Sequence, residues 1–247
     1  MLKVLLEACS YPEILKIWGK KTHTYRVGGE RARDIELITT VKQAALEQDY
    51  RIIGGKTGMW TCDGYDQHNL VMVAEHRVTH KAFAGVILGA DSADGRFSAM
   101  HELFDIASER AEGIASARSV THAVSAIVCE LPKYTTAMYQ CAPIDILYEQ
   151  EADREHVPAS VNKVVSLITA LDYLPTIKDT VELEAKDVKG GSGAVHYEGD
   201  LLSVEEMIYS MLLPSSNTCA TALASLVGGI ILKKNAEKTQ RAFALNI

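Results

Sequence analysis

The 247-residue chain is 47% hydrophobic and 23% charged, an ordinary composition for a soluble globular protein of one large domain or two small ones. A formal net charge of -7 argues against nucleic acid as a general partner, because phosphate binding requires a basic surface. No apolar run reaches the roughly 18 residues that a membrane-spanning helix needs.

The N-terminal region predicts helices followed by strands. Apolar residues recur at helical spacing over 2–17, interrupted near Pro12, so the start reads as an amphipathic helix rather than a secretion signal. Residues 34–54 predict a mixed strand and loop region, and residues 56–61 can be extended.

A hairpin and a long helix are predicted next. The apolar runs 69–75 and 82–88 flank a short polar stretch, which indicates an antiparallel hairpin. Residues 96–111 have helical periodicity, and the helix should stop near Gly113. The small residues of 112–118 resemble a linker.

The second half continues the mixed pattern. Further strands are expected at 123–129, 137–141 and 181–184, and helices at 160–174, 203–213 and 217–227. Ser203 and Glu206 form a capping box in front of the second of these helices. The glycine-rich residues 189–193 predict a turn.

The five cysteines are an odd number without CxxC spacing, which argues against a zinc site or a dense disulfide framework. We expect mostly buried thiols and leave one unassigned disulfide open. The cysteines are Cys9, Cys62, Cys129, Cys141 and Cys219.

Ser160 and Lys163 are three residues apart at a predicted helix start, so both project from one face. A lysine whose pKa is lowered can take the serine proton, and the helix N-terminus favours an oxyanion. The structural alternative is a serine N-cap beside a solvated lysine. Alone, this pair would favour that alternative.

Two other motifs can also be interpreted as either functional or structural. Ser215 and Asn217 lie between two predicted helices, where they can face a cleft or simply cap a helix. The stretch Lys56-Thr57-Gly58-Met59 follows two glycines. A P-loop is set aside because Tyr50 stands where its first glycine belongs. A strand edging a cleft and an ordinary glycine-rich turn both remain open.

A metal site has little support. His76 and His80 are four residues apart but fall in the expected hairpin turn, without the glutamate of the zinc-protease pattern. A solvated turn is the better interpretation.

Together, the three motifs carry a family resemblance. Ser-x-x-Lys at 160–163, Ser-x-Asn at 215–217 and Lys-Thr-Gly at 56–58 resemble the elements of D-alanyl-D-alanine carboxypeptidases, the low-molecular-weight penicillin-binding proteins. Serine β-lactamases are more distant relatives. The runs around each motif are similar too, and the resemblance covers most of the chain.

The motif order differs from the family's, because Lys-Thr-Gly comes first here. Residues 1–113 resemble the family's C-terminal half, and residues 119–247 its N-terminal half. The resemblance therefore implies one circularly permuted domain over 1–247, with 113–122 joining the old ends. Asn217 is followed by Thr218 where the family usually has Asp.

The implied fold is α/β, with an antiparallel sheet flanked by helices, a helical subdomain, and an active site between them. The implied catalytic residues are Ser160 as nucleophile, Lys163 as general base and Ser215 as proton relay. The implied substrate-binding residues are Asn217, Lys56, Thr57, Gly58 and Met59. The Met59 and Ser160 amides would bind the oxyanion.

The resemblance implies peptidoglycan peptides and β-lactam antibiotics as partners, no cofactor or metal, and an extracytoplasmic location. No clear counterpart appears of the glutamate with which class A β-lactamases activate the deacylating water. The alternatives left open are a serine β-lactamase or esterase, and a non-catalytic protein that binds muropeptides or penicillin.

Overall fold

The computed structural model describes residues 1–247 except 42–45, 63, 133–143 and 246–247, and describes no side chain at 62 or over 237–245. The chain forms two compact units. The first comprises Met1–Lys21 and Thr39–Val165, and the second Thr22–Ile38 and Ser166–Ile247. Each unit is built from distant parts of the sequence.

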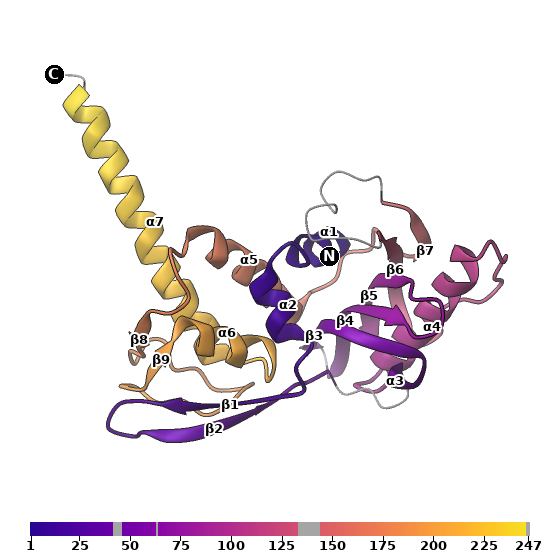
Figure 1. The fold of residues 1–247 in the computed structure, drawn as a ribbon, viewed down its shortest axis with the longest axis horizontal. Coiled ribbons are helices and arrows are strands. Elements are labelled where there is room, and N and C mark those ends of the chain that lie inside the picture. The colour runs from indigo at the N-terminus through magenta and orange to yellow at the C-terminus, as the bar shows by residue number, and fades with distance from the viewer. Residues whose placement is uncertain (42–45, 63, 133–143, 246–247) are drawn as a thin grey trace. The chain divides into compact units, whose positions relative to one another are not determined.

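The first unit contains a five-stranded antiparallel sheet in the order β3-β4-β5-β6-β7 (Figure 1). Its strands are β3 Tyr50–Cys62, β4 Tyr65–His76, β5 Ala82–Ala90, β6 Ala123–Leu131 and β7 Ile146–Gln150. Its helices are α1 Leu2–Ala8, α2 Pro12–Trp18, α3 Leu46–Asp49, α4 Gly95–Ala111 and the short 3-10 turn η1 Ala159–Asn162. Helix α5, Lys163–Tyr173, begins in this unit.

The sheet is covered on both faces. Residues 68–74 of β4 are buried without alternation, as expected for a strand between two layers. Met72 joins the core cluster that α4 forms with Phe83 and Phe104, while α1 contacts β4 and β5. A Cβ on Gly85 would lie 2.7 Å from the Met100 sulfur, so this glycine lets α4 approach β5 closely.

The second unit contains two small antiparallel sheets and three helical segments (Figure 1). Strands β1 Thr22–Val27 and β2 Arg33–Ile38 form a hairpin, and β8 Thr180–Glu182 pairs with β9 Leu201–Ser203. The remainder of α5 is followed by α6 Val204–Leu212 and α7 Asn217–Leu245.

A buried polar network lies in the core of the second unit. The Tyr25 hydroxyl is 2.7 Å from His196 Nε2 and 2.8 Å from Ser210 Oγ. These bonds connect the β1–β2 hairpin to α6 and to the loop before β9, so one network joins three parts of the unit.

Most predicted elements are confirmed. The hairpin, the helix that ends near Gly113, the strand at 123–129 and the Ser203–Glu206 capping box are all present. The two N-terminal helices separate at Pro12, as the interruption suggested. The strand predicted at 137–141 lies outside the described residues.

Several boundaries were wrong. The predicted helix over 160–174 begins with the 3-10 turn η1, and α7 continues past the predicted end at 227. Of the two interpretations left open for the stretch around Gly54 and Gly55, the strand is confirmed, because both glycines lie inside β3. Trp18 packs on Gly54, whose added Cβ would come within 2.6 Å of it, so the glycine serves packing.

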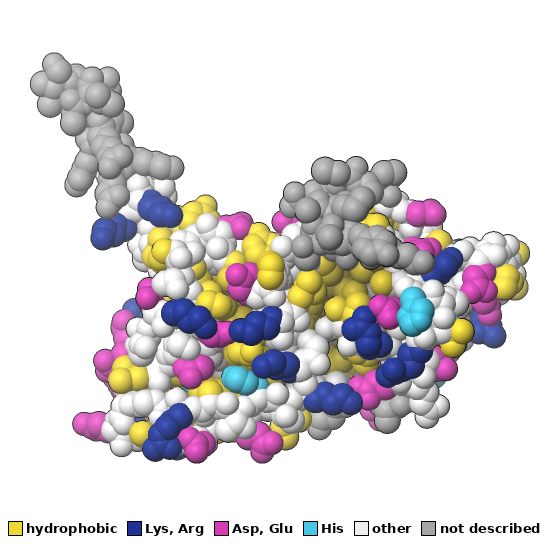
Figure 2. Space-filling model, viewed as in Figure 1, with side chains coloured by type: hydrophobic (Ala, Val, Ile, Leu, Met, Phe, Trp, Pro, Cys, Tyr) yellow, Lys and Arg dark blue, Asp and Glu magenta, His cyan; other side chains and the backbone are white. Residues whose placement is uncertain are grey.

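The described surface mixes charges of both signs. On the face shown in Figure 2, lysine and arginine side chains lie among aspartates and glutamates. Within the described residues, no helix has the length and apolarity to cross a membrane.

Candidate active site

The Ser160–Lys163 pair lies where η1 passes into α5. Lys163 Nζ donates a hydrogen bond of 3.2 Å to Ser160 Oγ. Both residues are half-buried, so the hydroxyl is reachable while the lysine nitrogen is partly withdrawn from water. Ser160 lies inside η1, and the cap position belongs to Pro158. Ser160 is therefore not the N-cap of this helical turn.

Strand β3 lies directly against this turn. A Cβ on Gly58 would stand 2.7 Å from the Pro158 carbonyl oxygen and 3.2 Å from the Val161 nitrogen. Only glycine permits so close an approach without displacement of the backbone. The Lys-Thr-Gly motif and Ser160 thus meet within the first unit, although they are about a hundred residues apart in sequence.

Lys56 is a fully buried lysine. Its Nζ donates a hydrogen bond of 2.9 Å to the Thr57 carbonyl. Burial holds the pKa of Lys56 well below its usual value, and the nearby positive charges of Lys163 and Arg96 lower it further. Lys163 and Arg96 therefore lie close enough to Lys56 for their positive charges to disfavour its charged form.

Arg96 belongs to this cluster, although sequence reasoning did not identify it. Its Nη1 donates to the Gly58 carbonyl at 3.4 Å from the first turn of α4, and burial lowers its pKa. Its Nε is buried without a hydrogen-bond partner among the described residues. The only sequence signal was a basic residue at the predicted start of a helix.

The other residues of β3 vary in exposure. Thr57 is buried, and its hydroxyl donates to Thr40 Oγ1 at 2.7 Å. A substrate carboxylate would have to share or replace that bond. Met59 is 58% exposed.

The second-motif residues lie in the second unit. Ser215 is buried with a positive φ of 68°, and Asn217 begins α7. The Asn217 side chain donates to the Gly190 carbonyl at 3.1 Å. The capping role belongs to Ser216, whose Oγ accepts from the Cys219 amide. The alternative of a helix cap is thereby met by the middle serine, not by Ser215 or Asn217.

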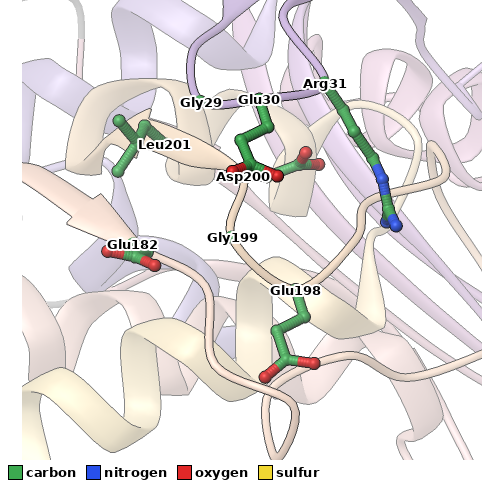
Figure 3. A pocket seen from close by; sticks show the side chains of 8 residues that line it. All are labelled: Gly29, Glu30, Arg31, Glu182, Glu198, Gly199, Asp200 and Leu201. Carbon is green, nitrogen blue, oxygen red and sulfur yellow. The ribbon is translucent and has the colours of Figure 1, made fainter.

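The second unit also holds a cavity of about 400 Å³. Its lining residues are Gly29, Glu30, Arg31, Glu182, Glu198, Gly199, Asp200 and Leu201. Figure 3 shows the carboxylates of Glu30, Glu182, Glu198 and Asp200 around it. None of the predicted site residues lines this cavity.

The described side chains do not favour a metal centre or a disulfide. Within the described ranges, no three His, Cys, Asp or Glu side chains gather in a way that could hold a metal ion. His76 pairs with Thr79 at the hairpin turn, and His80 lies beside Glu75. Cys9, Cys129 and Cys219 are buried thiols, and the pairing of Cys62 and Cys141 lies outside the described side chains.

Comparison with known proteins gives one family match, over part of the chain. Residues 145–241 match the model of the Beta-lactamase enzyme family, over less than half of the chain. The matched segment contains Ser160, Lys163, Ser215 and Asn217, but not β3. No curated protein and no solved structure matches the chain. The family match supports a serine hydrolase of the superfamily that includes β-lactamases and penicillin-binding proteins.

Proposed function

We propose that the chain is a serine-type D-Ala-D-Ala carboxypeptidase that acts on peptidoglycan stem peptides through an acyl-enzyme. The observation that carries the proposal is the 3.2 Å bond between Lys163 Nζ and Ser160 Oγ, beside the buried lysine of β3. Since peptidoglycan lies outside the cell membrane, we place the activity in an extracytoplasmic compartment.

In the acylation step, Lys163 acts as the neutral amine: Ser160 Oγ attacks the carbonyl between the two terminal D-alanines while Lys163 Nζ accepts its proton. The resulting oxyanion is bound by the Met59 and Ser160 amides. The C–N bond then breaks, the departing D-alanine amine takes a proton, and Ser160 keeps the acyl group. The family resemblance assigns the transfer of that proton from Lys163 to Ser215, and the placement of the substrate to Asn217. Water later hydrolyses the ester.

The cationic groups near β3 give the reaction its preference for a terminal carboxylate. Arg96 supplies positive charge near β3, and a bound carboxylate would favour protonation of Lys56, whose pKa is otherwise held low by burial. Thr57 can add a hydroxyl donor to the same carboxylate. Penicillins carry a carboxylate near their reactive amide, so β-lactams should acylate the same serine.

The family match favours a second candidate, a serine β-lactamase. The two activities differ in the acyl-enzyme's fate, because a β-lactamase hydrolyses the penicilloyl ester rapidly. A third outcome, a protein that binds these ligands without catalysis, would show no covalent adduct.

One experiment separates these functions. D-alanine release from diacetyl-Lys-D-Ala-D-Ala is measured beside benzylpenicillin hydrolysis, for the wild type and for Ser160→Ala. We expect release of D-alanine, slow penicillin turnover and loss of both in Ser160→Ala. Fast penicillin turnover without D-alanine release would show that the protein is a β-lactamase and not a carboxypeptidase. If neither activity is detected, both hypotheses are rejected.

A further inference from the structure

The segment in front of Ser160 is tied to the sheet by the side chain of Asn69, in β4. Asn69 is fully buried, and both ends of its amide are used. Its Nδ2 donates to the Val157 carbonyl at 2.9 Å, and its Oδ1 accepts from the Gly89 amide at 2.9 Å. Asn69 therefore fixes the 157 carbonyl to the end of β5.

A second buried tie holds the same segment one residue earlier. Ser125 Oγ, in β6, donates to the Glu151 carbonyl at 2.7 Å and lies 2.8 Å from His156 Nε2. Because the hydroxyl proton is used on Glu151, the His156 nitrogen is the donor to Ser125. Residues 156 and 157 are thus fixed by side chains from two different strands.

The backbone that follows is strained. Ala159 has a φ of +50°, a left-handed conformation that an alanine adopts only when its surroundings impose it. The Pro158 carbonyl accepts from the Val161 amide at 3.2 Å, and this bond closes the turn that presents Ser160. If the hydrogen bond to the Val157 carbonyl were lost, Ala159 could leave its left-handed conformation, and the Ser160 hydroxyl would move.

We propose that Asn69 is a positioning residue for the nucleophile: its amide holds the Val157 carbonyl so that Ala159 stays left-handed and Ser160 stays within reach of Lys163. The inference rests on the proposed function for its kinetic consequence, but its structural part does not. Asn69 touches none of the reacting atoms, and it acts through the turn.

The test compares Asn69→Asp with wild type. Aspartate keeps an acceptor for the Gly89 amide but has no donor for the Val157 carbonyl. We expect acylation by a fluorescent penicillin to slow by about 10²-fold, a loss of the size seen when a reacting group is misplaced by about 1 Å. The concentration for half-maximal rate should change less than about threefold.

Two further variants make the test specific. Gln150→Glu makes the same amide-to-acid change in β7, where the side-chain amide donates to the Val120 and Ala123 carbonyls. It should acylate within about threefold of wild type. Ala159→Gly accepts a positive φ without strain. Combined with Asn69→Asp, it should restore at least about tenfold of the lost rate.

Two results would show that Asn69 does not position Ser160. Folded Asn69→Asp that acylates at the wild-type rate, or a loss that Ala159→Gly does not reduce at all, would overturn the proposal. Asn69→Ser, which adds no charge, replaces Asn69→Asp in every arm if the aspartate variant does not fold.

Hydrogen exchange separates this inference from the proposed function. In Asn69→Asp, the Val161 amide should exchange about tenfold faster or more, while the Gly89 amide remains protected. If wild type is never acylated but this exchange pattern appears, the proposed function fails and the positioning role stands. Unchanged exchange at Val161 rejects the positioning role whatever the activity.

Discussion

Lys163 is the residue on which the proposed chemistry turns, because Ser160 is a weak nucleophile without a base. We predict that Lys163→Ala lowers the rate of penicillin acylation by about 10³-fold or more while the fold remains intact. Stopped-flow measurement with a fluorescent penicillin, beside circular dichroism, provides the check. Lys186→Ala removes an exposed lysine paired with Glu184 and should leave the rate unchanged. Retained acylation in Lys163→Ala would exclude its role as the base.

The buried side chain of Lys56 should make the stability of the folded protein depend on pH. Its folded-state pKa lies below the unfolded value of about 10.4, so the unfolded chain binds more protons between the two values. Stability should therefore rise with pH through this window. Lys56→Met, of similar volume, should weaken that rise and be at least as stable as wild type at pH 7, yet acylate about 10²-fold more slowly.

Urea unfolding at a series of pH values from 6 to 10 tests the stability part, with penicillin labelling in parallel. Lys20→Met, which replaces a surface lysine, is the control and should preserve the slope. A slope in Lys56→Met equal to that of wild type would show that Lys56 does not titrate as proposed.

How far the sequence predicts the site depends on the distance between its residues. The Ser160–Lys163 pair follows from helical spacing, and their contact is local. Asn69 and Val157, in contrast, are 88 residues apart, and no periodicity relates a buried strand asparagine to a distant carbonyl. Arg96 was missed for the same reason, since its meeting with β3 depends on how α4 packs.

At the scale of elements, Arg33 of β2 joins the strand to the segment before β9. Its guanidinium makes two hydrogen bonds to the buried Asp200 carboxylate, at 2.9 and 2.7 Å. Burial alone would raise the pKa of Asp200, but the bonds from Arg33 and from the Tyr197 amide outweigh it and leave the pKa lowered. This pair should stabilise the second unit.

The sign of its pH dependence follows. A lowered carboxyl pKa stabilises the folded state above the unfolded pKa of about 3.9, and the contribution is lost as the pH falls through the folded pKa. We predict that Arg33→Ala costs about 2–4 kcal/mol at pH 7, somewhat less than a fully buried pair because Arg33 is partly exposed. The difference from wild type should shrink below about pH 4.

Urea unfolding between pH 7 and pH 3 measures both effects. Arg26→Ala removes the exposed pair with Asp34 in the same hairpin and should cost less than about 1 kcal/mol. Equal losses in the two arginine variants would show that the Asp200 pair contributes no more than a surface contact.

Elements with strong local signals were predicted well. The capping box of α6 and the β4–β5 hairpin follow from residue types a few positions apart. The strands β1 and β2 were harder to recognise, because only two residues of each are buried and the others are mostly polar. Helix α7 passes through Gly228 and Gly229, a pair that normally indicates a helix end.

At the scale of the whole molecule, the proposed permutation concerns the segment after Gly113. Residues 114–119 have no regular structure and are mostly exposed, between α4 and β6 of the same unit. The two sides are also joined through the pairing of β5 with β6. A segment that joins former chain ends should tolerate a break.

We predict that a protease site inserted between Ser116 and Ala117 can be cut without separation of the fragments. The cut protein should elute as one species on size exclusion and keep at least about half of the acylation rate. The uncut insertion variant is the control. Fragments that separate or unfold would show that this connection is required for the fold.

The account as a whole depends on Ser160 being the acylated residue. The most direct measurement is peptide mapping by mass spectrometry after incubation of the folded protein with benzylpenicillin. We predict one penicilloyl group per chain, carried by the peptide that contains Ser160 and absent in Ser160→Ala. A folded protein without any adduct, or with the adduct on another residue, would contradict the account.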